Sequence, residues 1–175
     1  IHNPDFYGTT KFLGEKLVQT FSEKVTTIAI RLPGIVGPNL PAGRPWLHTI
    51  AKKLQLGEDV EYYNPKSLFN NICDLWTISD FIIHLSTRTN LQRCSTVNLA
   101  ASEPIQLHKV IDLMRERLNS SSKITKQKTN KTSFTIETGI VENEYDYLPA
   151  TTTEMATRFV DDSFFHINNR QKDDP

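Results

Sequence analysis

The chain has 175 residues, of which 38% are hydrophobic and 23% are charged, so it can bury one core of an ordinary soluble globular protein. Twenty basic and twenty acidic residues give a formal net charge of zero, which provides no electrostatic reason to expect a nucleic acid or an anionic membrane as a partner. Only two cysteines, Cys73 and Cys94, are present, too few for a disulfide scaffold and without the repeated spacing of a zinc site.

The apolar runs and the first residues of the chain bear on its cellular location and on whether it is complete. No apolar run is long enough to span a bilayer, and the first seven residues (IHNPDFY) lack the basic and apolar parts of a signal peptide. We therefore expect a cytoplasmic protein. Because the chain opens at Ile1 and enters directly into a predicted helix cap, we also expect that a part upstream is missing.

The first predicted element is a helix over Pro4–Glu23. Asn3 is its expected N-cap, Pro4 its first residue, and Asp5 a first-turn carboxylate that suits the helix dipole. Its apolar residues recur at helical spacing, so we expect one side to pack on a core or on a partner helix. These residues are Phe6, Leu13, Leu17, Val18 and Phe21.

Two glycines, Gly8 and Gly14, interrupt this helix. Each costs roughly 1 kcal/mol relative to alanine in a helix interior. Such glycines usually mark a close approach of another segment, and we expect one here.

Strand-like and helix-like segments alternate along the rest of the chain. Strands are predicted over Val25–Leu32, Val60–Tyr63, Thr96–Leu99 and Phe134–Ile136, and helices over Pro45–Leu56, Ser79–Ser86, Gln106–Leu118 and Thr152–Phe165. Prolines and glycines over residues 33–38 predict a loop after the first strand. Residues 119–133 are polar and locally basic, and without an interleaved aromatic residue a solvated loop is favoured over a nucleic-acid contact.

Candidate chemistry lies in the first predicted helix, where Tyr7 and Lys11 are four residues apart and share one face. A phenol with a pKa near 10 is a poor proton donor or acceptor at neutral pH, and a lysine held beside it favours the phenolate and lowers the pKa. Tyrosine then becomes a usable general acid or base. The alternative is a half-buried tyrosine and an exposed lysine on an ordinary helix.

Four segments, in order, resemble extended short-chain dehydrogenases/reductases of the NAD-dependent epimerase/dehydratase type. Residues 7–15 (YGTTKFLGE) resemble the active-site helix of that family, and residues 28–39 (IAIRLPGIVGPN) resemble its following strand and loop. Residues 74–81 (DLWTISDF) and 147–152 (YLPATT) are similar to two later motifs. The resemblance covers nearly the whole chain and identifies it as a C-terminal portion.

The resemblance implies roles for particular residues. Tyr7 would be the catalytic acid/base, Lys11 would hold the nicotinamide ribose, and Tyr7, Lys11 and Pro33 would contact the NAD or NADP cofactor. The loop from Gly34 to Asn39 would face the substrate, a nucleotide-activated sugar, with Gly34 and Asn39 in contact with it. Such enzymes commonly form homodimers through the helix that carries the tyrosine. No metal site is expected.

The chain also departs from the family pattern. It lacks the glycine-rich turn that binds the dinucleotide pyrophosphate, and the family's catalytic Ser/Thr would lie upstream of its first residue. Gly34 stands where such enzymes often carry an asparagine, and Cys73 where many carry an arginine that grips the diphosphate. Arg44 or Lys66 would then have to neutralise a diphosphate.

Other reactive residue types are interpreted as structural. His48, His84 and His108 have no second ligand-type residue at metal spacing, and Cys73 has no activating base nearby in sequence. Trp46 is either a packing residue or, because it follows the substrate-side loop, a residue of the pocket.

We therefore expect an α/β fold, the C-terminal part of a doubly wound Rossmann-type parallel sheet with a small substrate-capping region. Residues 1–40 would end the dinucleotide-binding domain, 41–168 would mostly bind substrate and return sheet elements, and 169–175 would be a tail. The hypothesis is an NAD(P)-dependent epimerase, dehydratase or reductase of a nucleotide sugar. A non-catalytic protein of this fold, sensing a dinucleotide or pairing with another subunit, is the alternative, as is a truncated inactive remnant.

Overall fold

The structure is a computed structural model that describes residues 5–39, 45–130 and 132–165. The helices within these ranges are α1 (Phe6–Gln19), α2 (Trp46–Leu56), α3 (Leu75–Ser86), α4 (Leu107–Arg117), α5 (Gly139–Tyr145) and α6 (Thr152–Phe164). The strands are β1 (Thr27–Arg31), β2 (Gly34–Val36), β3 (Val60–Tyr63), β4 (Leu68–Phe69), β5 (Ile72–Asp74), β6 (Cys94–Asn98), β7 (Ile105–Gln106) and β8 (Ile124–Gln127).

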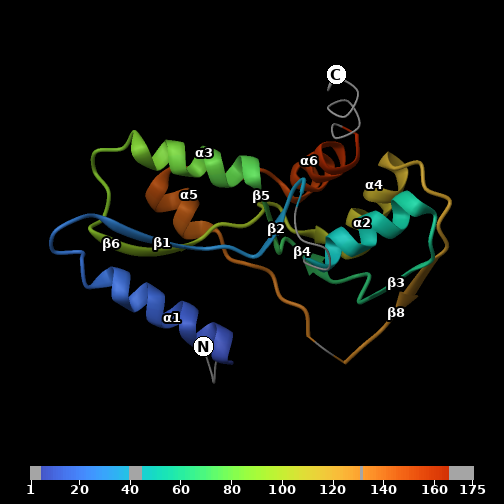
Figure 1. The fold of residues 1–175 in the computed structure, drawn as a ribbon, viewed down its shortest axis with the longest axis horizontal. Coiled ribbons are helices and arrows are strands. Elements are labelled where there is room, and N and C mark those ends of the chain that lie inside the picture. Colours follow the sequence, from blue (N-terminus) through green and yellow to red (C-terminus); the bar gives the residue numbers. More distant parts are fainter. Residues whose placement is uncertain (1–4, 40–44, 131, 166–175) are drawn as a thin grey trace, which may run out of the picture.

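Three layers form around the parallel pair β1–β6. The two strands pair in register from Thr27 with Cys94 to Arg31 with Asn98. Helix α1 lies on one face of this pair, and α3 and α5 lie on the other (Figure 1). Parallel strands with helices on both faces are the doubly wound arrangement. The predicted α/β fold class is therefore confirmed.

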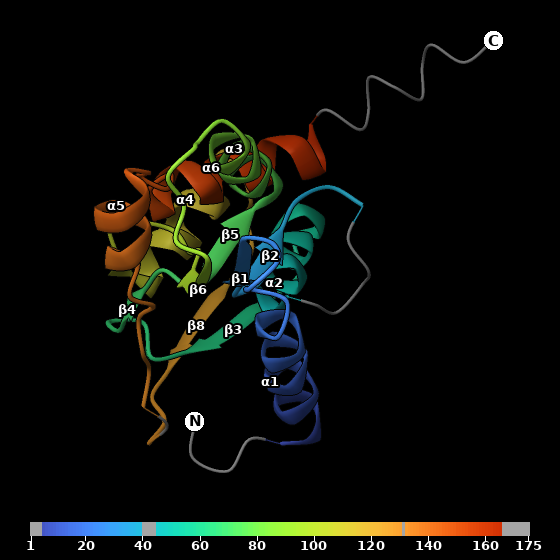
Figure 2. The same cartoon turned by 90° about the vertical axis from the view of Figure 1, so that its left-hand side faces the viewer.

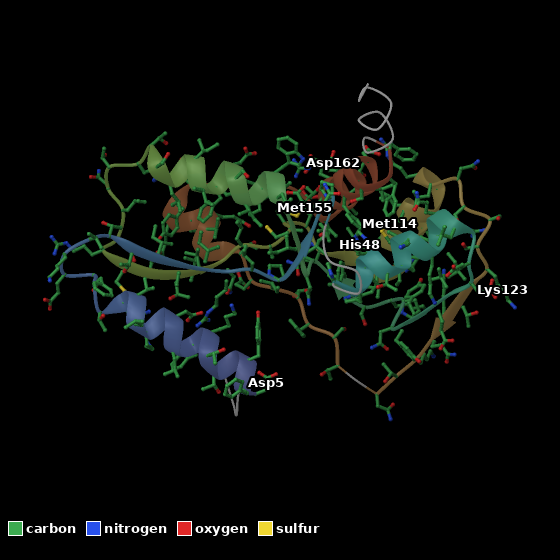
Figure 3. The ribbon with its side chains drawn as sticks, viewed as in Figure 1. Asp5, His48, Met114, Lys123, Met155 and Asp162 are labelled. Carbon is green, nitrogen blue, oxygen red and sulfur yellow. The ribbon has the colours of Figure 1, made fainter. Side chains whose placement is uncertain are left out.

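A second region is built on the parallel pair β3–β8. Helices α2 and α4 lie beside this pair, and α4 packs against α6 (Figure 2). The antiparallel pair β4–β7 and the parallel pair β2–β5 connect the two regions. The largest buried side chains between the helices include Leu47, Leu54, Ile111, Met114, Met155 and Phe159. Figure 3 labels Met114 and Met155 within this packed interior.

Helix α1 begins later than expected and packs differently. Its N-cap is Asp5, whose Oδ1 accepts a hydrogen bond from the Gly8 N–H at 2.6 Å, so Asp5 is a cap and not a first-turn residue. Asn3 and Pro4, the expected start, lie outside the described residues. The helix ends at Gln19, and hydrogen-bonded turns carry the chain on to Val25.

The apolar face of α1 does not pack on a core within the described chain, so of the two expected packings the one on a partner helix stays a prediction. No residue of α1 is buried, and Leu17 is 63% exposed. No segment of the described chain approaches Gly14 closely, because a Cβ there would meet no atom within 4 Å. What joins α1 to the sheet is polar: the Arg31 Nε and Nη2 donate to the two carboxylate oxygens of Glu15, each at 2.8 Å.

Several elements of the structure differ from those expected from the sequence, because tertiary contacts override local composition. The predicted loop over 33–38 contains β2, and the polar stretch over 119–133 contains β8, each formed by pairing with a distant strand. Phe134–Ile136 is not a strand in the structure. Helix α3 begins at Leu75 rather than Ser79, because the Asp74 Oδ1 caps it by accepting the Thr77 N–H at 2.8 Å. The seven-residue helix α5 has no counterpart among the predicted helices.

Candidate functional site

The ion pair between Glu15 and Arg31 locates the start of α1 relative to the end of β1. Arg31 is the last residue of β1, and α1 runs in the opposite direction to β1 (Figure 1). Tyr7 precedes Glu15 by eight residues, or roughly 12 Å along a helix. The first turns of α1 therefore lie beyond the carboxyl end of β1, the edge of a parallel sheet where ligands bind in open α/β folds. Figure 3 labels Asp5 at this end of α1.

Tyr7 and Lys11 lie together on this end of α1. The Lys11 Nζ is 5.2 Å from the centroid of the Tyr7 ring, and Tyr7 is 68% exposed. Within the described chain, neither the phenol hydroxyl nor the ammonium forms a hydrogen bond or ion pair. Both groups are thus free to meet a ligand from the solvent side.

A pocket of about 240 Å³ lies at the carboxyl ends of β1 and β6. Arg31, Leu32 and Pro33 form one side of it, and Asn98 and residues 135–137 form the other. Pro33, the expected cofactor contact, therefore lines a cavity at the same sheet edge as Tyr7.

Gly34 and Asn39 have different surroundings. Gly34 opens β2, and a Cβ at this position would lie 3.1 Å from the Pro45 Cβ and 3.4 Å from the Asn71 carbonyl oxygen. An asparagine would require the Pro45 ring to move by a few tenths of an ångström, so the glycine fits the close packing at this position. Asn39 occupies a turn with φ 58°, a left-handed conformation that asparagine tolerates. Asn39 is not among the residues that line the pocket at Pro33.

A larger pocket of about 440 Å³ lies between α2 and β3. Trp46 lines it and also packs edge-on against Phe69, with the ring centroids 5.7 Å apart, so this tryptophan both packs in the fold and faces a cavity. Other lining residues are Thr49, Ile50, Lys53, Val60, Glu61, Tyr62, Tyr63 and Leu107. An apolar cavity with a few polar groups is typical of a small-molecule site.

Within the described chain β3 pairs only with β8, so one edge of β3 is open. The Val60 N–H donates to the Lys123 carbonyl and the Asn64 N–H to the Gln127 carbonyl, each at 2.9 Å. Alternate residues of a strand direct their backbone groups to opposite edges. The peptide groups of Glu61 and Tyr63 consequently face the open edge beside the larger pocket.

Tyr62 adds a polar group near this pocket. Its side chain is buried, and its hydroxyl has no hydrogen-bond partner among the described residues. Burial, and secondarily the negative charge of Asp112, raises the pKa of Tyr62 to about 12. The hydroxyl therefore remains a hydrogen-bond donor at neutral pH.

The cations expected to neutralise a diphosphate stay a prediction. Arg44 lies outside the described residues, and Lys66 is exposed in the turn after β3. Lys53 lines the larger pocket, although sequence reasoning missed it because a lysine in the last turn of a helix is common.

Cys73 has the structural role that was expected. It is fully buried, and burial, with a smaller contribution from the Asp74 charge, raises the pKa of the Cys73 thiol to about 12. At neutral pH it is therefore a thiol and a poor nucleophile.

The three histidines are likewise structural. His84 Nε2 lies 2.7 Å from the Tyr145 carbonyl oxygen, and His108 Nδ1 lies 3.0 Å from the Pro65 carbonyl oxygen. The His48 ring packs against aromatic rings of α6. Over the described ranges, no three His, Cys, Asp or Glu side chains gather as a metal site would require. In the same ranges no helix has the length and apolar character to cross a membrane.

Solved structures share this fold, although no protein-family model and no curated protein sequence matches the chain. The chain is similar to a UDP-glucose 4-epimerase of Thermotoga maritima, solved with UDP-glucose, at a TM-score of 0.70 and 14% identity, covering 93% of this chain and 54% of that one. It is similar to a dTDP-glucose 4,6-dehydratase of Bacillus anthracis in complex with NAD, at a TM-score of 0.68 and 12% identity. This match covers 97% of this chain and 54% of that one. It is also similar to RMD of Pseudomonas aeruginosa in complex with NADPH, at a TM-score of 0.71 and 11% identity. This match covers 92% of this chain and 57% of that one.

The chain thus spans just over half the length of these epimerases, dehydratases and related proteins. Because the identities are low, the likeness establishes the fold. The predicted resemblance to a portion of the Rossmann-type epimerase and dehydratase fold is confirmed at that level.

Proposed function

We propose that this chain is the C-terminal portion of an NAD(P)-dependent enzyme that epimerises, dehydrates or reduces a nucleotide-activated sugar. The observation that carries the proposal is the placement of Tyr7 and Lys11 beyond the carboxyl end of β1, the edge where Pro33 lines a pocket. The fold supports it, because the similar solved structures include epimerases and a dehydratase. Residues 1–40 then end the dinucleotide-binding domain, and 41–168 mostly bind substrate.

In this proposal Tyr7 is the acid/base. Its exposed hydroxyl exchanges a proton with a hydroxyl or keto group of the sugar, and Lys11 holds the nicotinamide ribose and favours the phenolate. Gly34 and Asn39 belong to the loop on the substrate side.

The residues present fit only the nicotinamide end of the cofactor. The unpaired Lys11 ammonium can donate to ribose hydroxyls, and Pro33 offers an apolar surface at the pocket. When bound, the nicotinamide supplies hydride transfer. Either NAD or NADP is the cofactor, and similar solved structures hold one or the other. The sequence has no glycine-rich turn for the pyrophosphate.

The nucleotide end of the substrate is assigned to the larger pocket. Trp46 offers an aromatic surface there, and the peptide groups of Glu61 and Tyr63 at the open strand edge can pair with the hydrogen-bonding edge of a base. Lys53, with Lys66 in the adjoining turn, supplies positive charge for a diphosphate.

Substitution Tyr7→Phe in the protein as its natural source produces it tests the assignment. We expect turnover of UDP-glucose to fall by about 10²-fold or more, since general acid–base catalysis contributes that much, while cofactor still binds. Tyr147→Phe is the matched control, because it removes a hydroxyl that donates to the Thr77 carbonyl oxygen, and neither residue lines the pocket at Pro33. Unchanged turnover in Tyr7→Phe would refute catalysis by this residue.

The second candidate is a non-catalytic dinucleotide sensor or subunit-pairing protein, or an inactive remnant. Gly34 and Cys73, which lack the polar contacts of the family, favour it. The intact mass from the natural source separates the possibilities: a mass well above 20.0 kDa favours the enzyme, and a mass equal to this chain favours the alternatives. We also propose a homodimer through the Tyr7 helix, whose apolar face is exposed, and a cytoplasmic location, supported by two free cysteines.

A further inference from the structure

Asn70 lies in the turn between β4 and β5, with a side chain only 1% exposed. Its Nδ2 donates to the carbonyl oxygens of Ala101 and Ile136, both at 2.9 Å. Its Oδ1 accepts from the Ile136 N–H at 2.8 Å. One buried carboxamide therefore joins three segments that are far apart in the sequence.

Both backbone groups of Ile136 are held by this one side chain, as a neighbouring strand would hold them. The next peptide unit is held by a second carboxamide, because Asn98 Nδ2 donates to the Glu137 carbonyl oxygen at 3.3 Å. Residues 132–138 form no helix or strand, so these two asparagines take the place of a sheet partner for the segment.

The segment held in this way is one wall of the small pocket. Residues 135–137 line it opposite Pro33, at the sheet edge beyond which Tyr7 lies. A wall without secondary structure keeps its place only through such contacts, and Asn70 supplies the buried ones. Asn70 itself does not line the pocket, so any effect on a ligand must pass through the wall.

We propose that Asn70 is a positioning residue that fixes this wall against the sugar end of the substrate. The inference rests on the proposed function, in which the sugar reacts at Tyr7 beyond the sheet edge where this pocket lies, and the nucleotide binds at the pocket beside β3. Replacing Asn70 should then weaken the binding of the sugar and leave the binding of the nucleotide unchanged. A purely structural role would weaken both ends together or neither.

Asn70→Ala in the protein from its natural source tests this with two measurements. Hydrogen exchange of the Ile136 amide should accelerate, because its acceptor is gone. The affinity for UDP-glucose should fall about tenfold, the equivalent of 1.4 kcal/mol, while the affinity for UDP, which lacks the sugar, should stay within twofold.

Two further variants complete the comparison. Ser102→Ala is the control: it removes another buried hydrogen bond to a loop carbonyl, from Ser102 Oγ to Pro149 at 2.7 Å, and should change neither the exchange of Ile136 nor either affinity. Asn70→Ser, which keeps a short hydroxyl in the buried site but cannot hold both backbone groups of Ile136, replaces Asn70→Ala if that variant does not fold. It too should weaken UDP-glucose more than UDP.

The outcomes are separable. Unchanged exchange at Ile136, equal weakening of UDP and UDP-glucose, or faster exchange with unchanged UDP-glucose affinity each overturns the inference. A wild-type protein that binds neither UDP-glucose nor UDP refutes the proposed function and the inference with it. That result is visible before any variant is made.

Discussion

Asp74 is predicted to be the most costly polar residue to remove from the described chain. Its Oδ1 caps α3 through the Thr77 N–H, and its Oδ2 lies 2.8 Å from the Arg158 Nε, although this ion pair is not aligned as a hydrogen bond. The Asp74 side chain is 3% exposed and that of Arg158 is 37% exposed. Loss of a cap costs about 1 kcal/mol. Breaking a fully buried pair costs about 3–5 kcal/mol, which partial exposure of Arg158 reduces to about 2.

Asp74→Ala should therefore lower the free energy of unfolding by about 3 kcal/mol, or the melting temperature by about 6–12 °C for a chain of this size. Asp74→Asn keeps a capping oxygen and should cost only the ion-pair share, about 2 kcal/mol. Asp80→Ala, on the exposed face of the same helix, is the control and should stay within about 0.5 kcal/mol of wild type. Urea denaturation followed by circular dichroism measures all three, and an Asp74→Ala variant as stable as Asp80→Ala would refute the reasoning.

Two further predictions concern His48 and Gly14. Burial against Phe159 and Phe164, with a smaller effect of Lys52, lowers the pKa of His48, so the fold disfavours its protonation and loses stability as the pH falls below about 6.5. The stability difference between wild type and His48→Gln in urea should therefore shift against wild type from pH 7.5 to pH 5, and a constant difference would contradict this. Gly14→Ala should stabilise the monomeric chain by about 1 kcal/mol, because the new methyl group meets no atom within 4 Å. Destabilisation in urea at concentrations where the protein associates would instead indicate that a partner packs on α1 at Gly14.

Regular elements with local signals could be predicted from the sequence. Helix α2 ends at Leu56 before Gly57 as expected, and β3 has the expected bounds. The alternating apolar residues of β3 and the apolar stripe of α4 predict these elements from the local sequence alone. The same holds for α6, whose capping box at Thr151 and Glu154 precedes an apolar helix.

Elements that depend on distant partners could not be predicted in this way. Apart from the half-buried Ile124, strand β8 consists of polar residues with exposed side chains, and its backbone pairing with β3 makes it a strand. The wall at 135–137 depends on Asn70, which lies 66 residues earlier. Asn98 could have been found, since it is a polar residue at the end of strand β6, whereas nothing in the sequence around Asn70 indicates its contacts.

The two departures from the family pattern have structural reasons, and this weakens the case for a non-catalytic protein. A side chain at Gly34 would press on Pro45, so the glycine follows from packing. Cys73 is fully buried next to the ion pair of Asp74, where an arginine would bring a further charge into the core. Under the proposed function the charge of a diphosphate would be met at other positions, and Lys53 at the larger pocket is suited to it. The missing contacts at Gly34 and Cys73 therefore do not by themselves indicate that substrate binding was lost.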